Sequence, residues 1–377
     1  MGFDSSLSMC LTIYLHLHVE LEGLLVEFKL LHAHMWFAEE LSLHFVYRFK
    51  VAQAVPMNDM ISFEDLSKKI NVDQLTVIRL LRNAMTFHMF HEPKKGFVAH
   101  TQDSRLLVED ETLYDFVGCA LEDLRPGANN QLEAIEKWPG SQEPNHTGYN
   151  IAFNTELPLY RYLSQYPERI RRVSALMAQV MKSGFRDAKR IAELYPWESL
   201  GQGTIIDMGG GSGHNSVALA RAHSKLKFIV QDLPSVTAQG EANLPAELQG
   251  QVSFMAHDFF KDNPVKDATA FFMMNTLHTW SDKYVVQIFK QLVPSLKPGA
   301  RILVCDRVVP EQGTVSDVEY KEIRSVDIYM MHSVNGRERS AEDIFGLFKE
   351  TDARFKHFKS YNNSSSLYTI CEAVWEP

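Results

Sequence analysis

The chain has 377 residues, which is enough for two domains that each bury a sizeable core. A hydrophobic share of 45% and a charged share of 23% exclude a disordered or fibrous protein. The formal net charge of −9 argues against a nucleic-acid partner, since basic residues that neutralise phosphates dominate such binding. Four scattered cysteines lack metal or disulfide spacing, so we expect free thiols in a reducing compartment and a cytoplasmic protein: Cys10, Cys119, Cys305 and Cys371.

An apolar stretch over residues 7–19 has the character of a signal-peptide centre. No basic residue precedes it, however, and His16 and His18 interrupt it. It is too short to span a membrane, so we predict a helical arm that takes part in dimerisation. Histidines at 16, 18, 32, 34 and 44 could suggest a metal site, but they form no convincing ligand set, and no metal is expected.

Residues 62–100 are predicted to form a small helical unit. Ser62 with Asp65 three residues later is typical of a helix start, and a second helix is predicted over residues 73–87. Residues 92–100 are predicted to form a tight two-stranded wing. A helix–turn–helix with a wing could bind DNA, but the second helix offers only Arg79 and Arg82 as basic residues. A packing or dimerisation role is therefore favoured, and residues 1–112 are predicted to form a winged-helix-like dimerisation region.

Residues 113–200 are predicted to form a helical linker. Met177 and Met181 are four residues apart and therefore share one helical face. A core position and a position lining an aromatic substrate pocket explain these two methionines equally well. We expect the linker to line the substrate pocket.

Residues 204–214 read TIIDMGGGSGH and are the most informative stretch of the chain. A strand-like run is followed by glycines at every second position, namely Gly209, Gly211 and Gly213. A buried strand that ends in a glycine loop and opens a helix lets a nucleotide-like ligand approach the backbone, because a Cβ would block that approach. A bare glycine turn in an ordinary α/β domain gives the same pattern.

Two acids distinguish between possible cofactors. Dinucleotide folds use G-x-G-x-x-G, whereas the spacing here is G-x-G-x-G, and Asp207 just before the loop would repel a pyrophosphate. Asp232 ends the next strand-like run, 25 residues after Asp207, where a carboxylate can bind ribose hydroxyls. An amino-acid-bearing nucleoside with an ammonium group and no phosphate is S-adenosylmethionine, which the sequence therefore predicts as the cofactor.

The C-terminal half alternates strands and helices, which favours a parallel α/β sheet. After Asp232 the predicted elements are helix 235–241, strands 252–256 and 268–274, helix 282–296, strand 301–305, helices 319–331 and 341–350, and strands 355–360 and 367–374. A short polar turn separates the last two strands, so they should pair antiparallel at the sheet edge. Residues 201–377 are thus predicted to form a Rossmann-like, seven-stranded domain of the class I methyltransferase kind.

From about residue 147 onward the chain resembles the plant-type small-molecule O-methyltransferases, the caffeate O-methyltransferase-like family, and most closely their fungal relatives that methylate polyketide phenols. The motifs that carry this resemblance follow the family order: DMGGGSGH, FIVQDLPSV, AHDFF, LHTWSD, LKPGARILVCD and NGRERS. Residues 61–100 also fit, because the family uses a winged unit to dimerise and to cover its partner's substrate pocket. The resemblance implies a homodimeric enzyme that methylates a phenolic or enolic hydroxyl of a secondary metabolite, without a nucleic-acid or membrane partner.

The resemblance also implies a role for each matching residue in cofactor binding. The glycine loop, preceded by Asp207, would wrap the methionine end of S-adenosylmethionine. Asp232 with Leu233 would hold the ribose, and Asp258 with Phe259 would bracket the adenine. In the helix predicted over residues 319–331, Met330 is expected to line the substrate pocket together with the two methionines of the linker.

His278 matches the general base of the family, and Asp306 and Glu338 match the two acids that flank it. A phenol has a pKa of ~10 and a histidine ~6.5, a mismatch of about 5 kcal/mol if proton transfer preceded attack. Two carboxylates near the imidazole reduce that cost, because they stabilise the imidazolium. No metal is required for this chemistry.

Two positions depart from the family pattern. The residue after the histidine is usually aspartate and is Thr279 here, and the residue four before it is usually basic and is Met274 here. These departures leave two alternatives to methyl transfer open. One is a pericyclase or dehydratase of the same fold that uses the sulfonium as a fixed charge, and the other is a binding protein that has lost the chemistry.

Overall fold

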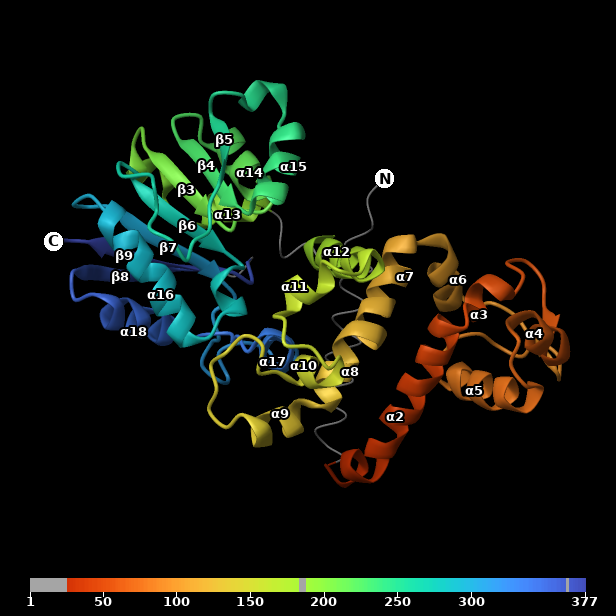
Figure 1. Ribbon diagram of the computed structural model, residues 1–377. Coiled ribbons are helices and arrows are strands. Elements are labelled where there is room, and N and C mark those ends of the chain that lie inside the picture. The colour runs from red at the N-terminus through yellow and green to blue at the C-terminus, as the bar shows by residue number, and fades with distance from the viewer. Residues whose placement is uncertain (1–25, 183–187, 364–365) are drawn as a thin grey trace. The chain divides into compact units, whose positions relative to one another are not determined.

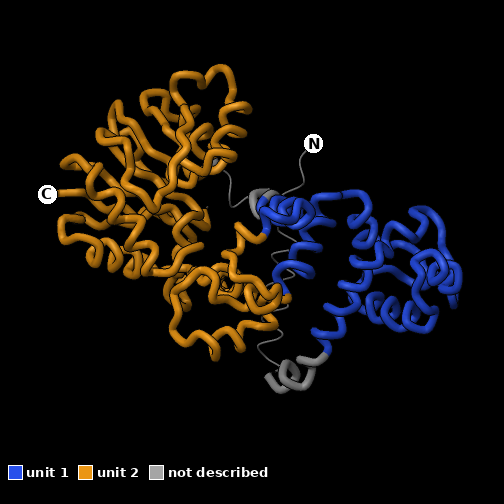
Figure 2. Tube along the Cα trace, viewed as in Figure 1, with its two compact units in different colours: residues 1–125, 163–179 blue, residues 126–162, 180–377 orange. Residues whose placement is uncertain are grey.

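The structure is a computed structural model, and it describes residues 26–182, 188–363 and 366–377 (Figure 1). The chain divides into two compact units, and each draws on two separate stretches of chain. Unit 1 consists of Met1–Arg125 and Leu163–Gln179, and unit 2 consists of Pro126–Tyr162 and Val180–Pro377 (Figure 2). The predicted linker over 113–200 is therefore divided between the two units. The apolar stretch over residues 7–19 lies outside the described residues.

Unit 1 is mainly helical, and two of its helices begin where the sequence predicted capping groups. Ser62 accepts a hydrogen bond from the Asp65 amide at 3.0 Å, and Asp73 accepts one from the Thr76 amide at 2.9 Å. Its helices are α2 (Val26–Arg48), α3 (Val51–Ala54), α4 (Phe63–Ile70), α5 (Gln74–Thr86), α6 (Gln102–Glu109), α7 (Glu111–Gly118), a π-helix (Cys119–Leu124) and most of α12 (Pro167–Lys182).

The predicted wing pairs differently from the expectation. Strand β2 (Phe97–Val98) pairs antiparallel with β1 (Ile61–Ser62), the two residues before α4, and not with a neighbour inside 92–100. A single antiparallel bridge joins Ala99 to His91, the residue just before that segment. The predicted two-stranded wing is therefore reduced to one bridge, and its longer pairing is with β1; Val98 of β2 is fully buried in the helical core.

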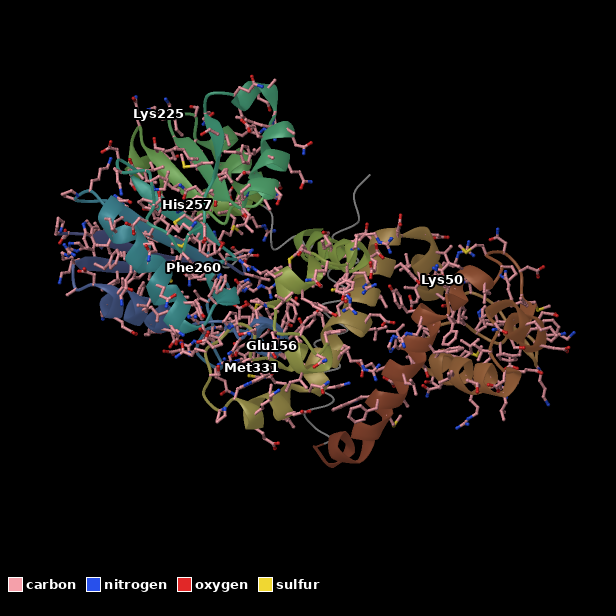
Figure 3. All side chains as sticks on the ribbon, viewed as in Figure 1. Lys50, Glu156, Lys225, His257, Phe260 and Met331 are labelled. Atoms are coloured by element: carbon pink, nitrogen blue, oxygen red, sulfur yellow. The ribbon has the colours of Figure 1, made fainter. Side chains whose placement is uncertain are left out.

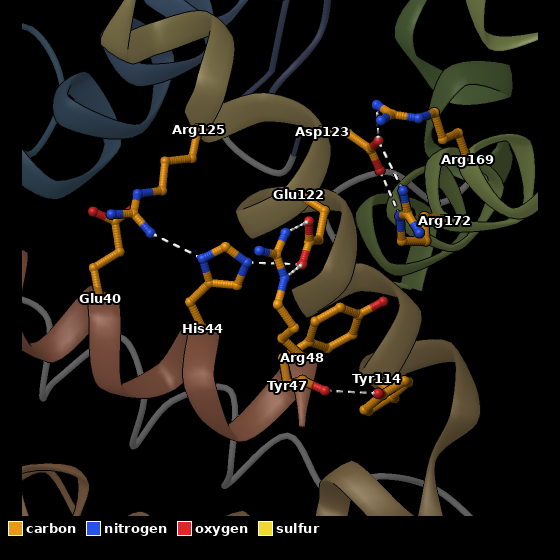
Figure 4. A network of polar contacts seen from close by, with 10 residues as sticks. All are labelled: Glu40, His44, Tyr47, Arg48, Tyr114, Glu122, Asp123, Arg125, Arg169 and Arg172. Atoms are coloured by element: carbon orange, nitrogen blue, oxygen red, sulfur yellow. Dashed lines mark hydrogen bonds and ion pairs between the residues drawn. The ribbon is translucent and has the colours of Figure 1, made fainter. Parts of the chain in front are cut away.

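A network of buried charges ties the helices of unit 1 together (Figure 4). Asp123 of the π-helix is 1% exposed and accepts hydrogen bonds from Arg169 and Arg172 of α12 at 2.9 and 2.6 Å. The preceding residue, Glu122, is bound instead by Arg48 and His44 of α2. Two consecutive acids of the π-helix thus anchor two different helices, and His44 belongs to this network.

Unit 2 contains a seven-stranded sheet within the described ranges, in the order β5-β4-β3-β6-β7-β9-β8. The strands are β3 (Thr204–Met208), β4 (Lys227–Asp232), β5 (Val252–Ala256), β6 (Ala270–Met274), β7 (Arg301–Asp306), β8 (Phe355–Tyr361) and β9 (Thr369–Trp375). The first five strands in that order are parallel, whereas β9 pairs antiparallel with both β7 and β8. The predicted seven-stranded sheet with an antiparallel final pair is confirmed.

Helices cover both faces of this sheet (Figure 1). They are α13 (Ala188–Leu194), α14 (His214–Ala222), α15 (Pro234–Ala242), α16 (Asp282–Leu292) and α18 (Ala341–Thr351). Helix α17 (Asp317–Val334) packs against α10 (Gly148–Ala152), and α8 (Arg125–Asn129), α9 (Gln131–Lys137) and α11 (Leu159–Leu163) are the other short helices of this part of the chain. Successive residues of β3 enter different cores, since Ile205 packs with α13 and α14 and Ile206 packs with α16 and α18. Burial on both faces explains why the parallel strands read as continuous apolar runs.

The differences from the predicted boundaries in unit 2 are small. Strand β6 begins at Ala270, two residues later than predicted, and α16 ends at Leu292, followed by a 3₁₀ turn over Val293–Ser295 that contains Pro294. Proline lacks the amide hydrogen that a continuing helix needs, so the helix ends there. Among the described residues, no helix combines the length and apolar character needed to cross a membrane.

Candidate active site

The glycine loop lies between the end of β3 and the start of α14, where the sequence predicted it. Gly209, Gly211 and Gly213 all have positive φ, at 68°, 60° and 82°, a backbone region that disfavours other residues. A Cβ on Gly213 would lie 2.8 Å from the ring of Phe254, so this glycine is needed for packing. A Cβ on Gly211 would meet no protein atom within 4 Å, so the backbone there is open to a ligand.

Asp207 lies beneath this loop with an uncompensated charge. It is 1% exposed, and its Oδ2 accepts a hydrogen bond from the Ser216 hydroxyl at 2.6 Å. Its Oδ1 has no hydrogen-bond partner among the described residues. Burial raises the pKa of this carboxyl to about 6, and Asp232 adds to the rise although Ser216 opposes it. A buried carboxylate that lacks a counter-charge suits a cationic ligand group such as an ammonium.

Asp232 ends β4, next to Asp207, and connects the glycine loop to that strand. Its Oδ2 accepts a hydrogen bond from the Gly211 amide at 2.9 Å, and its Oδ1 accepts one from the Leu233 amide at 2.7 Å. Leu233 follows with 57% of its surface exposed. An apolar side chain with that exposure beside a strand-end acid offers a contact surface for a bound nucleoside.

Asp258 and Phe259 follow β5, the strand beside β4, and their sequence neighbours His257 and Phe260 are labelled in Figure 3. Asp258 is exposed and accepts the Phe260 amide at 3.0 Å, and the Phe259 ring lies 6.0 Å from that of Trp280. The sequence-predicted cofactor residues therefore follow the carboxyl ends of three neighbouring parallel strands, β3, β4 and β5. Such an edge is where open α/β sheets bind ligands.

His278 and Glu338, which are 60 residues apart in sequence, form a direct pair. Nδ1 of His278 lies 2.8 Å from Oε1 of Glu338, and the Glu338 side chain is fully buried. Burial lowers the pKa of His278, but the hydrogen bond and charge of Glu338, with Asp306, outweigh it, so that the pKa is raised above 6.5. With Nδ1 engaged, Nε2 is the ring nitrogen that can exchange a proton with a ligand.

Asp306 lies at the end of β7 and completes this cluster. It is 6% exposed, and its Oδ1 has no hydrogen-bond partner in the described chain. Burial raises the pKa of Asp306 to about 6, with His278 opposing and Glu338 reinforcing the rise. The structure thus brings together the three residues that the sequence assigned to one catalytic group: the imidazole pairs with Glu338, and the buried Asp306 is near enough to act on it by charge.

Arg339 is a residue of this site that the sequence interpretation did not assign. It is 5% exposed, and its guanidinium contacts the turn that carries His278. The NGRERS motif contains Arg337 and Arg339 on either side of Glu338, and nothing in the sequence separates the exposed arginine from the buried one. The side chain of Arg337 is 43% exposed, so only the fold distinguishes the two.

The two departures from the family pattern have simple local roles. Met274 is 6% exposed and packs with Cys305 and Ile370 at the end of β6. The Thr279 hydroxyl donates a hydrogen bond to the Thr276 carbonyl at 2.7 Å and so stabilises its own turn. Met274 therefore acts as a core residue, and Thr279 as a turn residue.

The three methionines predicted to line a substrate pocket are not brought together within one unit. Met330 is 6% exposed on α17 in unit 2, whereas Met177 is 41% exposed on α12 in unit 1. The side chain of Met181 lies outside the described residues. Their role in substrate binding remains a prediction.

Parallel strands that end in a glycine loop and two acids, beside a histidine with two buried carboxyls, define a class I S-adenosylmethionine-dependent methyltransferase. A family model described as the O-methyltransferase domain matches residues 140–354. The chain belongs to this family and is an S-adenosylmethionine-dependent O-methyltransferase. The predicted family, enzyme class and cofactor are thereby confirmed.

Relatives from fungi match most of the chain. It is 35% identical over 339 residues to the grayanic acid biosynthesis cluster O-methyltransferase of Cladonia grayi, covering 89% of this chain and 71% of the relative. It is 36% identical over 345 residues to O-methyltransferase AMT9 of Alternaria alternata, covering 89% and 79%. It is 32% identical over 346 residues to the chlorophenol O-methyltransferase of Trichoderma longibrachiatum, covering 90% and 74%.

Solved structures with the same fold include one with bound SAH and one described as a pericyclic reaction enzyme. OxaC in complex with SAH and oxaline matches with a TM-score of 0.74 at 21% identity, covering 92% of this chain and 87% of that one. A structure described as a pericyclic reaction enzyme matches with a TM-score of 0.71 at 19% identity, covering 99% and 100%. At these identities the likeness establishes the fold alone.

Proposed function

We propose that this enzyme methylates a phenolic or enolic hydroxyl of an aromatic or polyketide secondary metabolite, with His278 as general base. The observation that carries this proposal is the contact between Nδ1 of His278 and Glu338, which directs Nε2 toward an acceptor and favours the imidazolium once the proton arrives. The names of the relatives support the substrate class, because one belongs to the grayanic acid cluster and another acts on chlorophenol.

The cofactor supplies an electrophilic methyl group on a sulfonium, and the residues of this chain supply orientation and proton transfer. Nε2 of His278 would accept the hydroxyl proton of the acceptor as the methyl group passes from the sulfonium, whose carbon–sulfur bond breaks to leave the neutral thioether, to the acceptor oxygen. Glu338 and Asp306 then stabilise the imidazolium by charge, as the raised pKa of His278 indicates. General-base help of this kind contributes about 10²–10⁴-fold, and orientation supplies much of the rest.

For the cofactor we propose the residues that the family pattern assigned. Asp207 would balance the ammonium group, for which its unpaired Oδ1 is available, and the backbone of Gly209, Gly211 and Gly213 would follow the methionine end. Asp232 with Leu233 would bind the ribose, and Asp258 with Phe259 the adenine. Met177, Met181 and Met330 would contact the acceptor.

We also propose that the enzyme is a cytoplasmic homodimer that uses a winged-helix-like region in unit 1 for association. An exposed apolar surface on α2 supports this proposal, with Trp36 at 55%, Phe37 at 66% and Leu41 at 52% exposure. Contiguous exposed apolar residues of this kind mark interaction surfaces.

Incubation of the enzyme with methyl-labelled S-adenosylmethionine and a panel of hydroxylated aromatics tests the reaction. We expect label in a product that has gained one methyl group. A product of unchanged mass and without label would instead support the pericyclase or dehydratase alternative.

His278→Ala tests the base assignment, and we expect kcat to fall about 10²–10⁴-fold with cofactor affinity retained. His223→Ala is a matched control, because Nδ1 of His223 pairs with Glu198 at 2.9 Å in a similar way, away from the three strand ends described above. Methylation that survives His278→Ala would show that another group takes the proton.

A further inference from the structure

The turn that carries His278 and the loop that carries Glu338 are joined by one buried arginine. Nη1 of Arg339 donates to the Leu277 carbonyl at 3.0 Å, and Nη2 donates to the Trp280 carbonyl at 2.6 Å. Its Nε donates to Oδ1 of Asp282, the first residue of α16, at 2.9 Å. The guanidinium therefore holds the main chain on both sides of His278.

Two further contacts fix the loop against the same turn. A Cβ on Gly336 would lie 2.1 Å from the His278 carbonyl oxygen, so a glycine is required for this close approach. The Glu338 amide donates to Oδ1 of Asp327 on α17 at 2.9 Å. The loop therefore lies directly on the histidine turn, and its acid is positioned from α17 as well.

We propose that Arg339 is a positioning residue for methyl transfer. By binding the carbonyls on either side of His278, it keeps the imidazole of His278 in contact with Glu338. This inference rests on the proposed function, since it concerns the base assigned there. Three donors in one plane are needed to reach two carbonyls and a carboxylate together. Lysine has a single nitrogen and cannot reproduce this geometry, although it keeps the charge.

The charge of Arg339 has a second effect on the same group. Three charged groups act on His278: Glu338 and Asp306 favour the imidazolium, and Arg339 opposes it and limits the rise of the pKa of His278. Arg339→Lys retains that charge and removes the planar set of donors of the guanidinium, whereas Arg339→Met removes both the charge and the donors. The two variants separate geometry from charge.

The matched control is Arg337→Lys, because Arg337 borders Glu338 on the other side and also pairs with Asp282, at 3.3 Å, and with Asp343. Among the described residues, the hydrogen-bond and ion-pair partners of the Arg337 side chain include no carbonyl of the His278 turn. Hydrogen exchange of the Thr279 and Trp280 amides, which close that turn onto Thr276 and Leu277, reports its rigidity without any acceptor substrate.

We expect Arg339→Lys to speed exchange of these two amides about tenfold and to lower kcat about 10–100-fold, with the KM for S-adenosylmethionine within about twofold of the parent. Arg339→Met should add a shift of the kcat/KM profile to higher pH. Unchanged exchange and kcat in Arg339→Lys, or equal effects in Arg337→Lys, would overturn the proposal. Faster exchange in an enzyme that methylates no acceptor would leave the positioning role intact and count against the proposed function.

Discussion

At the scale of single residues, the charge state of His278 sets the pH dependence of the reaction. The base is active when neutral, and its pKa is raised above 6.5, so we expect kcat/KM to rise with pH through a midpoint above that value. Glu338→Gln removes the largest stabilising partner of the imidazolium. The midpoint of the pH profile should therefore move to lower pH, and kcat should fall. A midpoint that stays in place in Glu338→Gln would show that this acid does not govern the base.

Ionisation of Asp306 should lower the stability of the folded protein, whereas ionisation of a salt-bridged acid raises it. Burial raises its folded pKa from 3.8 to about 6, so the folded state binds more protons between these values, and stability falls as pH rises through this window. In urea unfolding at about pH 8 we expect Asp306→Asn to be more stable than the parent, and this difference should shrink toward about pH 4. The variant should also lose activity.

Asp352→Asn is the control for that measurement. Hydrogen bonds with Arg354 lower the pKa of Asp352 in the folded state to about 2. The stability that its ionised carboxylate provides is therefore present above the unfolded-state pKa of 3.8 and is lost as pH falls through the folded-state pKa. This variant should be less stable than the parent at about pH 8. A stability change in the same direction for both variants at about pH 8 would contradict the roles assigned to the two carboxyls.

The site residues were predictable from sequence to different degrees. His278, Asp306 and Glu338 could be named because the motif order assigns them, but their direct contacts follow from the fold, which brings together turns that are 60 residues apart. The role of Arg339 could not be predicted, because a sequence states that an arginine carries charge and not that it will be buried against two carbonyls. Unpaired atoms such as Oδ1 of Asp207 are likewise known only from the structure.

At the scale of elements, the glycine loop offers a matched pair of substitutions. Gly211 and Gly250 have φ of 60° and 87°, and a Cβ on either would meet no protein atom within 4 Å. Alanine at either position should cost about 1–2 kcal/mol of stability through the left-handed conformation alone. Only Gly211→Ala should also weaken binding of S-adenosylmethionine, by about tenfold or more in calorimetry. Equal affinities in the two variants would place the ligand away from this loop.

The helices of unit 1 depend on Asp123 of the π-helix. Asp123→Ala leaves Arg169 and Arg172 without their shared carboxylate in a buried setting, where removal of one partner costs about 3–5 kcal/mol. Glu64→Ala is the control, because its pair with Lys68 is 64–67% exposed and solvent-exposed pairs contribute little to stability. Chemical unfolding of both variants measures the difference, and similar losses would show that the buried pairs add nothing.

Elements were predicted most accurately where local signals coincide. Strand β5 has the predicted bounds, β4 ends at Asp232, and β3 ends one residue after Asp207. The pairing of β2 with β1 was not predicted, because β1 is a two-residue strand more than 30 residues upstream, and pairing at that distance leaves no local pattern. Backbone pairing of short strands is decided by tertiary packing.

At the scale of the whole molecule, association is the property to measure. We expect sedimentation equilibrium to give a dimer, and Phe37→Glu on the exposed surface of α2 to shift the protein toward monomer, because it places a charge in an apolar contact. Ile328→Glu on α17 changes a residue of similar exposure, 52%, in unit 2 and should leave the dimer intact. A monomeric parent enzyme would refute the proposed homodimer.

The discontinuous make-up of unit 1 has a consequence for synthesis on the ribosome. Met1–Arg125 emerge first, but the arginines that neutralise Asp123 come from α12, after 37 residues of unit 2 have been translated. The nascent N-terminal segment therefore carries an unpaired acid in its core until residue 172 leaves the exit tunnel. A chimaera that exchanges residues 1–125 between related enzymes would separate this acid from its partners, whereas one that also includes residues 163–179 would keep the unit whole.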